Sequence, residues 1–274
     1  LVNALVGSPR IITYDRPCTT RDAVHTVLER DGHTYTLVDT AGVRRRTRVQ
    51  ESLEKFSAMK AIQAMEAAEV VLLLVDAREG VTDQDARLAR LVRDAGRGTI
   101  LVVNKWDGLD EEEKGRLQRT LDIKLTHNLD YAPMLRISAL HGTNVGHLLE
   151  AAERVYQAFT VDLSTNRVSQ VLNAATTAHP PPFRGGFRPK LRYAHQGGRC
   201  PPTFVIHGTR TGTLPANYRR YLERHFREAF ELEGVPVRLA MRTEANPYQG
   251  RARHKQPPKG KQGKKGKTGK RSKK

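Results

Sequence analysis

Short apolar runs that alternate with helical patterns organise the first 160 residues. Continuous runs of β-branched residues and leucine at 70–75 and 100–103 predict strands that are buried on both faces. Residues 24–30 and 33–39 predict two further strands, joined by a hairpin turn at Asp31-Gly32. Helical spacing predicts a remnant helix at 1–6 and helices at about 53–67, 82–94, 112–126 and 144–159. Strands that alternate with helices favour a parallel sheet with right-handed crossovers.

A second set of elements follows a boundary at about 160–168, where Ser164-Thr165-Asn166 can cap a helix. The pattern then predicts a helix at 167–178, strands at 190–196 and 203–208, a helix at 215–233 and a strand at 235–242. A proline-rich loop that includes Pro180-Pro181-Pro182 separates the first helix from the first strand. The order α-β-β-α-β predicts a small α+β module.

The tetrapeptide Asn104-Lys105-Trp106-Asp107, an N-K-x-D motif, follows the apolar run that ends at Val103. A carboxylate such as Asp107 can accept both N–H groups on the guanine edge that adenine lacks. Asn104 can bond the opposite edge of the base, and the stem of Lys105 can cover the ring face. A site built for paired donors rejects an analogue without them, because its own polar groups would stay unpaired.

Two further motifs lie at predicted strand ends, in the order that a nucleotide site requires. Asp39-Thr40-Ala41-Gly42 is a D-x-x-G motif, in which Asp39 can hold Mg²⁺ through water and the glycine lets a backbone N–H approach a phosphate. Residues 134–139 predict a strand that ends in Ser138-Ala139, where a backbone N–H could bond the guanine oxygen. Open α/β sheets bind ligands at the carboxyl ends of their strands, so the three motifs predict one site.

A phosphate-binding loop of the form G-x-x-x-x-G-K-[ST] is missing from the printed sequence. The chain starts Leu1-Val2-Asn3-Ala4-Leu5, without an initiating Met, and this segment looks like the helix that follows such a loop. We therefore expect a fragment cut just after the loop, lacking one strand in the middle of the sheet. The alternative is a relative that has lost the loop.

The motifs resemble those of the translation-factor-related GTPases, and the likeness is closer within that group. Residues 15–22, which contain Thr19-Thr20-Arg21-Asp22, resemble the switch I segment of the Era/EngA/TrmE group. Residues 39–46 resemble the second GTPase domain of EngA, also called Der. Val43 stands where Ras-like proteins have a water-orienting Gln, a replacement that the EngA group shares. Cys18 departs from the glycine that is usual in EngA, which leaves the shape of switch I open.

The C-terminal region resembles the KH-like domain that closes EngA. The matching segments are 191–198, 201–208, 218–223 and 244–248. A standard KH domain clamps nucleotides with a G-x-x-G loop, and Gly208-Thr209-Arg210-Thr211-Gly212 has the wrong spacing for one. RNA binding by the module is therefore predicted less firmly than its fold.

The resemblance implies an α/β fold with a P-loop GTPase-type, mostly parallel and N-terminally truncated sheet, followed by a small α+β KH-like domain. It implies three segments: a GTPase domain at 1–164 that lacks its first strand and phosphate loop, a KH-like domain at 165–250 and a basic tail at 251–274. It implies a cytoplasmic GTPase of ribosome biogenesis that acts in large-subunit assembly and contacts the ribosome and rRNA. The alternative is an RNA- or protein-docking module without GTP hydrolysis.

The resemblance also implies ligands and the residues that hold them. GTP or GDP and Mg²⁺ are expected, with K⁺ as a further candidate ion. The implied GTP-binding residues are Asp39, Thr40, Ala41, Gly42, Val43, Asn104, Lys105, Trp106, Asp107, Ser138 and Ala139. The implied Mg²⁺ ligands are Asp39 and Thr20, although Thr19 is an alternative to Thr20; the residues that carry out hydrolysis stay unknown.

Charge is distributed very unevenly along the chain. Residues 1–169 carry a net charge of −1, residues 170–250 carry +7, and residues 251–274 carry +12 with no acidic residue. This basic module and tail have the electrostatic footprint of a nucleic-acid partner, although the tail could also be a solubilising appendage. Its Gly, Pro and Lys content predicts disorder until it binds.

Other features narrow the class of protein. Two cysteines, Cys18 and Cys200, do not make a disulfide framework, and no apolar run approaches the length of a membrane span, so no membrane partner is expected. Arg44-Arg45-Arg46 could reach a phosphate, contact RNA or stay solvated. His195 and His207 on the predicted strands of the second module are expected to be structural rather than catalytic.

Overall fold

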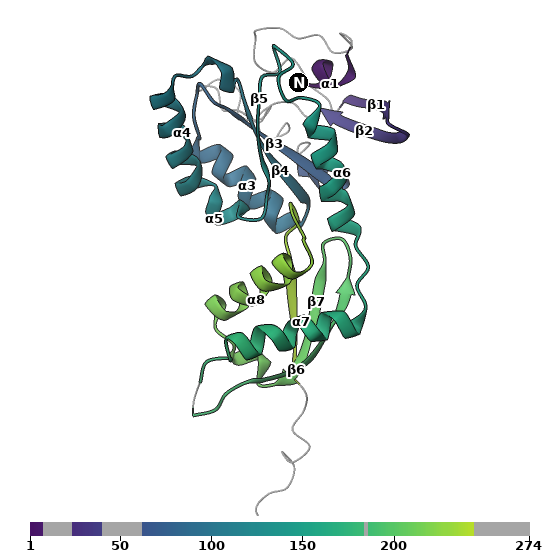
Figure 1. Ribbon diagram of the computed structural model, residues 1–274, viewed down its shortest axis with the longest axis vertical. Helices are drawn as coiled ribbons and strands as arrows, with labels where there is room; N and C mark the ends of the chain where they lie inside the picture. Colours follow the sequence, from purple (N-terminus) through teal and green to yellow (C-terminus); the bar gives the residue numbers. More distant parts are fainter. Residues whose placement is uncertain (8–23, 40–61, 184–185, 244–274) are drawn as a thin grey trace, which may run out of the picture.

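The computed structural model describes residues 1–7, 24–39, 62–183 and 186–243 (Figure 1). A three-stranded parallel sheet forms the centre of the first domain. Its strands pair in the order β3 (Val70–Asp76), β4 (Gly98–Asn104) and β5 (Met134–Ile137). The helices around it are α3 (Asp83–Ala95), α4 (Glu111–Lys124), α5 (Thr126–Leu129) and α6 (His147–Thr160). The parallel sheet alternating with helices confirms the predicted α/β class.

Alternating side chains of β4 divide the first domain into two cores. Leu101 and Val103 pack into a cluster with residues of α3, α4 and α5. Ile100 and Val102 pack on the opposite face, against α6. All four side chains are almost completely buried. The continuous apolar run follows from this arrangement, because both faces of the strand are covered by helices.

Side-chain caps decide where two of the helices begin. Thr82 accepts the Asp85 N–H at 3.2 Å, and Asp85 accepts the Thr82 N–H at 2.8 Å, which closes a capping box before α3. Asp110 and Glu113 form the same box before α4. The predicted helix at 112–126 therefore begins one residue earlier, and it divides after Lys124 into α4 and the short α5.

The hairpin of β1 (Val24–Arg30) and β2 (His33–Asp39) is antiparallel, as predicted. Asp31 and Gly32 both have positive φ, 52° and 79°, which a two-residue turn with the twist of a hairpin requires. Among the described residues the hairpin forms a sheet separate from the parallel one. It is attached to α6 instead, where Tyr35 donates to Glu153 at 3.4 Å and Leu37 packs against the core.

The second domain has a mixed three-stranded sheet in the order β6-β7-β8. Its elements are α7 (Thr165–Ala178), β6 (Lys190–Gly198), β7 (Thr203–Thr209), the short 3₁₀ turn η2 (Thr211–Thr213), α8 (Ala216–Ala229) and β8 (Arg238–Thr243). β6 and β7 are antiparallel, whereas β7 and β8 are parallel. Both helices pack on one face, over Ala194, Phe204 and Ile206. The observed order is the predicted α-β-β-α-β.

Two predicted boundaries in this domain were wrong, and one loop explains both. The helix predicted to reach 233 ends at Ala229, and the strand predicted from 235 begins at Arg238. Between them, Gly234 accepts the Thr99 N–H at 2.7 Å and donates its own N–H to the Tyr131 carbonyl at 2.8 Å. Val235 is fully buried in the α6-side core of the first domain. The loop thus belongs to the interface of the two domains.

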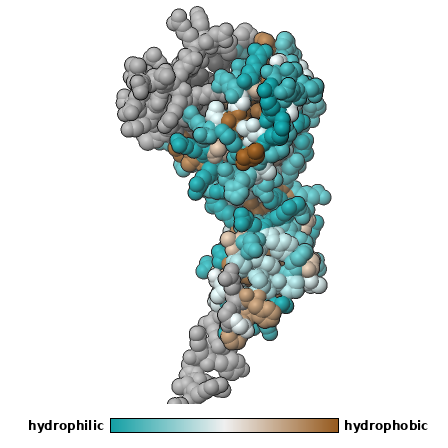
Figure 2. Space-filling model, turned by 90° about the vertical axis from the view of Figure 1, so that its left-hand side faces the viewer, coloured by the Kyte–Doolittle hydropathy of each residue, from teal (hydrophilic) through white to brown (hydrophobic). Residues whose placement is uncertain are grey.

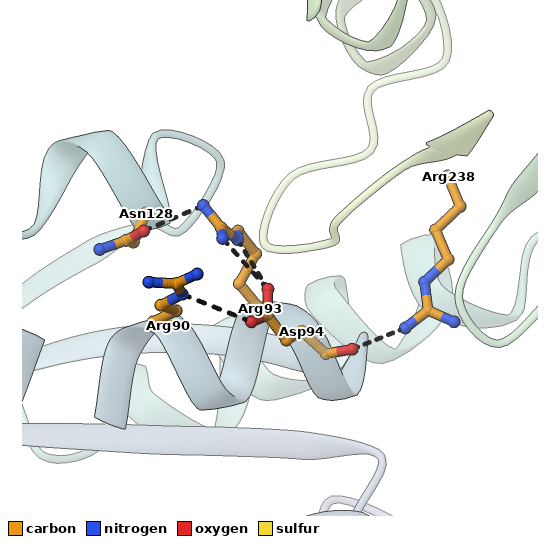
Figure 3. Close-up of polar contacts among 5 residues, drawn as sticks. All are labelled: Arg90, Arg93, Asp94, Asn128 and Arg238. Atoms are coloured by element: carbon orange, nitrogen blue, oxygen red, sulfur yellow. Dashed lines mark hydrogen bonds and ion pairs between the residues drawn. The ribbon is translucent and has the colours of Figure 1, made fainter. Parts of the chain in front are cut away.

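Ion pairs and side-chain hydrogen bonds reinforce the same interface. Arg227 of α8 makes a two-point contact with the Asp130 carboxylate, at 3.0 and 2.9 Å. Arg238 of β8 donates to the Asp94 carbonyl at the end of α3, at 2.8 Å (Figure 3). The same end of α3 is held to α5, because Arg93 donates to Asn128 at 2.9 Å. The contacts of Arg227 and Arg238 thus join the two domains between segments far apart in sequence.

The surface is predominantly hydrophilic on the face that Figure 2 displays, with small separate hydrophobic patches. Within the described ranges, no helix combines the length and the apolar composition that crossing a membrane requires.

Gly234→Ala should destabilise the protein by about 2–4 kcal/mol. Gly234 has a φ of +74°, and an added Cβ would lie 2.3 Å from Cγ2 of the buried Val155. Gly80→Ala is the matched control, because Gly80 has a φ of +73° and open space around it, so only backbone strain of about 1 kcal/mol remains. Urea unfolding measures both variants. Equal losses would contradict the tight packing of this loop.

Candidate functional site

The N-K-x-D motif lies where the carboxyl ends of the parallel strands meet. In the register of the sheet, Asn104 stands beside Asp76 of β3 on one side and Ile137 of β5 on the other. Asn104 accepts the Ala139 N–H through its side-chain oxygen, at 3.0 Å. This bond fixes the Asn104 amide and leaves its Nδ2 group as a donor for a ligand. It also engages the Ala139 N–H within the protein.

Lys105 turns the chain sharply after β4. It has a positive φ of 63°, in the left-handed region that non-glycine residues rarely adopt. Its ammonium lies 2.6 Å from the Asp76 carboxylate, and half of the Lys105 side chain stays exposed. Such conformations concentrate at functional sites, where neighbouring contacts hold them in place.

The pKa of Asp107 is lowered, which favours its ionised form. A hydrogen bond from the Ser138 side chain is the main cause, with smaller contributions from its own backbone N–H and from the neighbouring His141 and Arg78. His141 Nε2 lies 3.3 Å from the carboxylate, of which about a third remains exposed. An ionised carboxylate only accepts hydrogen bonds, which is the property that a pair of N–H donors requires.

The loop after β5 contains Ser138, and hydrogen bonds within the loop define its shape. Ser138 is 2% exposed, and it donates its N–H to the Thr143 carbonyl at 3.1 Å. Asn144 donates its side-chain amide to the Arg136 carbonyl at 3.0 Å. The loop therefore closes on itself, and within it the Ser138 hydroxyl accepts the His141 N–H at 3.4 Å.

Trp106 has different surroundings from its neighbours in the motif. Its ring packs against the core formed with α3 and α4. The Arg136 guanidinium lies over it, 4.7 Å from the ring centroid, and Arg136 is itself held by Gln118 at 2.8 Å. The side chain of Trp106 thus anchors the turn that carries Lys105 and Asp107.

Three residues at this site were missed in the sequence. Asp76, Arg78 and His141 contact Lys105 or Asp107, or act on Asp107 through charge. A signal for Asp76 was present, because it ends the buried run at 70–75 and so follows the strand-end rule that found Asn104. His141 lies three residues after Ser138, and only the fold of the loop brings it to Asp107.

The other predicted site residues lie outside the part that can be described in full. Asp39 ends β2, where its backbone pairs with Val24. Thr40, Ala41, Gly42 and Val43 lie outside the described residues, as do Thr19, Thr20, Cys18 and Arg44–Arg46. In the described ranges no group of three or more His, Cys, Asp or Glu side chains is placed to hold a metal ion.

Two family models match separate parts of the chain, and curated relatives match most of it. Residues 163–242 match the model of the KH-domain-like C-terminal domain of EngA bacterial GTPase enzymes. The chain belongs to the EngA/Der family. Residues 1–105 of this EngA/Der-family chain also match the model of a 50S ribosome-binding GTPase.

Relatives of the EngA/Der chain share about half of its residues. It is 53% identical to GTPase Der of Methylococcus capsulatus and 50% identical to GTPase Der of Thioalkalivibrio sulfidiphilus, over 92% of this chain in each case. It spans 54% of the length of each of these relatives. Among solved structures, Aquifex aeolicus Era bound to GDP and AlF₄⁻ is 19% identical, with a TM-score of 0.49 over 88% of this chain and 87% of that one.

Ser138→Ala should raise the pKa of Asp107 toward the ordinary carboxyl range. The lowered pKa means that the folded state favours the ionised form, so the stability that Asp107 contributes is present above its unfolded pKa and lost as the pH falls through the folded one. Without the Ser138 hydroxyl that loss should be smaller, and it should be complete at a higher pH. An NMR titration of the side-chain carboxyl carbon measures the shift.

Asp83 is the internal control for this titration. Its pKa is also lowered, but by a hydrogen bond from Lys124 and not from Ser138. An unchanged Asp107 titration in Ser138→Ala, with Asp83 unchanged as well, would show that the hydroxyl does not stabilise the carboxylate.

Proposed function

We propose that this chain is the guanine-recognising and RNA-binding part of a GTPase that acts in assembly of the large ribosomal subunit in the cytoplasm. The observation that carries the proposal is the N-K-x-D turn at the end of β4, where the Ala139 N–H fixes the Asn104 amide at 3.0 Å and the Asp107 carboxylate stays about a third exposed. The two family matches support the same activity, and the GTPase Der relatives carry it in their name.

The chemistry of guanine fits the groups at this site. The Asp107 carboxylate would accept the ring N–H and the exocyclic amine of the base, which together replace the contact with His141. The Nδ2 group of Asn104 would donate to the opposite edge. Lys105, held by Asp76, would lay its aliphatic stem along the ring face. Because Ala139 already donates to Asn104, its main role here would be to orient that side chain.

Further parts of the proposal rest mainly on residues outside the described ranges. Asp39 and Thr20 would hold Mg²⁺, and residues 40–43 would approach the phosphates. The metal would neutralise charge that develops on the phosphates during hydrolysis; K⁺ is a further candidate ion. The division into a GTPase domain at 1–164, a KH-like domain at 165–250 and a basic tail at 251–274 belongs to the same proposal.

The alternative is a docking module in which the GTPase portion is only structural. The absence of G-x-x-x-x-G-K-[ST] from the printed residues favours this alternative for the chain itself. GTP hydrolysis by residues 1–274, compared with that by the natural gene product that contains them, separates the two proposals. Turnover by the natural product alone would assign the missing phosphate contacts to residues beyond the printed sequence.

Asp107→Asn should weaken binding of guanine nucleotides by about a hundredfold or more, because two hydrogen bonds to a charged acceptor are lost. Binding of xanthine nucleotides should rise, since the new amide can donate to the 2-oxo group. Fluorescent GDP measures affinity on the natural gene product, with unlabelled GDP, XDP and ADP as competitors. Equal competition by ADP and GDP for the original protein would contradict guanine recognition. Asp110→Asn, at an exposed cap on the next helix, is the matched control.

Deleting residues 251–274 should weaken binding to rRNA and flatten its dependence on salt. The segment carries twelve Lys/Arg and no acidic residue, and each phosphate that it neutralises releases counterions. Guanine-nucleotide affinity should stay unchanged. The measurement is rRNA affinity at several salt concentrations. Identical slopes with and without the segment would leave it as a solubilising appendage.

A further inference from the structure

The sheet of the second domain has one face that its two helices leave uncovered. α7 and α8 bury Ala194, Phe204 and Ile206, which point to the opposite face of the sheet. Side chains alternate along a strand, so Tyr193, His195 and His207 point away from the helices. Tyr193 is 41% exposed. No helix of the described part packs on this outer face.

Three rings form a continuous stack on this face. Tyr193 and His207 pair across β6 and β7, with ring centroids 4.4 Å apart and planes within 5°. His195 stacks on His207 from the other side, at 5.2 Å and 28°. Nearly parallel rings at these distances form a π surface whose outermost member, Tyr193, remains open to solvent.

The charged side chains on the strands that carry the rings are all positive. The three strands β6, β7 and β8 contain no Asp or Glu, whereas they contain Lys190, Arg192, Arg238 and Arg242. Arg242 is in register with His207, so it lies on the same face and next to the stack. Arg238 is engaged with Asp94 across the domain interface. A surface of this charge favours a polyanion as the ligand. It disfavours a protein partner that carries no acidic residues.

The middle ring of the stack, His207, is closed to a ligand. His207 Nε2 is buried and makes no hydrogen bond to the described residues. Tyr193 and His195 both stack on its ring, so Tyr193 is the ring of the three that a ligand can reach. The apolar area of the face is small, since only Val205 and Ala240 add to it, which argues against a hydrophobic protein interface.

We propose that this face is a stacking platform for single-stranded RNA, with the Tyr193 ring, backed by His207, receiving a base and Arg242 contacting the phosphate backbone. The inference rests on the RNA-binding part of the proposed function and gives it a location. Single strands are favoured over duplex, because only unpaired bases can leave their own stack to lie on a protein ring. The platform also accounts for RNA binding without a G-x-x-G loop.

Tyr193→Leu tests the platform, because it keeps an apolar side chain on an exposed strand position and removes the π surface. The probe is a fluorescein-labelled single-stranded RNA of about ten nucleotides, within the range that such surfaces cover. Affinity, measured by anisotropy on the whole chain, should fall by about tenfold, the loss expected for one stacked base. The salt dependence should not change, because stacking releases no counterions.

Three comparisons make the result specific. Tyr193→Phe keeps the ring and should bind like the original chain. Tyr156→Leu, at a 46% exposed position on α6, should also leave affinity unchanged. Arg242→Gln should weaken binding and lower the salt slope by about one, as loss of one phosphate contact does. The same RNA annealed to its complement should bind with no dependence on Tyr193.

Two outcomes would overturn the inference, and they differ in whether the proposed association with RNA is overturned as well. If the original chain binds the single strand and Tyr193→Leu binds it equally well, the platform is wrong while the proposed association with RNA stands. If the original chain binds neither the single strand nor rRNA, both fail. Equal sensitivity of duplex binding to Tyr193→Leu would assign the face to shape recognition instead of stacking.

Discussion

The parallel pairing of β3, β4 and β5 is the constraint on which the candidate site depends. Its register brings the ends of three strands to one edge, so that Asp76, Asn104 and Ser138 become neighbours although more than sixty residues separate the first from the last. A slip of one residue would turn Asn104 to the other face of the sheet. Burial of β4 on both faces prevents that slip, since Ile100 and Leu101 must stay in their own cores.

The loop at Gly234 connects the second domain to the parallel sheet of the first domain. Its backbone bonds to Thr99 at the beginning of β4 and to Tyr131 before β5, so the two domains meet at the opposite end of the strands from the candidate site. Gly234 has no Cβ and a positive φ, and both are needed where the chain passes within contact of Val155. Arg227 and Arg238 add polar contacts around this point. These contacts connect the domain that carries the candidate guanine site to the domain that carries the open sheet face.

Much of the fold could be predicted from local sequence patterns. The apolar runs of the buried strands and the Asp31-Gly32 turn act within a few residues of themselves, and the strands that they form were predicted to within a few positions. The errors fall at 230–237, where a helix was extended too far and a strand was begun too early. Propensity favoured regular structure there, whereas contacts with Thr99 and Val155, over 70 residues away, impose an irregular loop.

The candidate site shows the same division between sequence and structure. By itself the sequence determined that Asn104, Asp107 and Ser138 follow strands, because the residue types and apolar runs that reveal them are adjacent in the chain. Only the tertiary structure decided that Ser138 lowers the pKa of Asp107, that His141 and Asp76 join the site, and that Tyr193 and His207 stack on an open face. Each of these depends on distances between segments that no local pattern records, because strand register and loop closure set them.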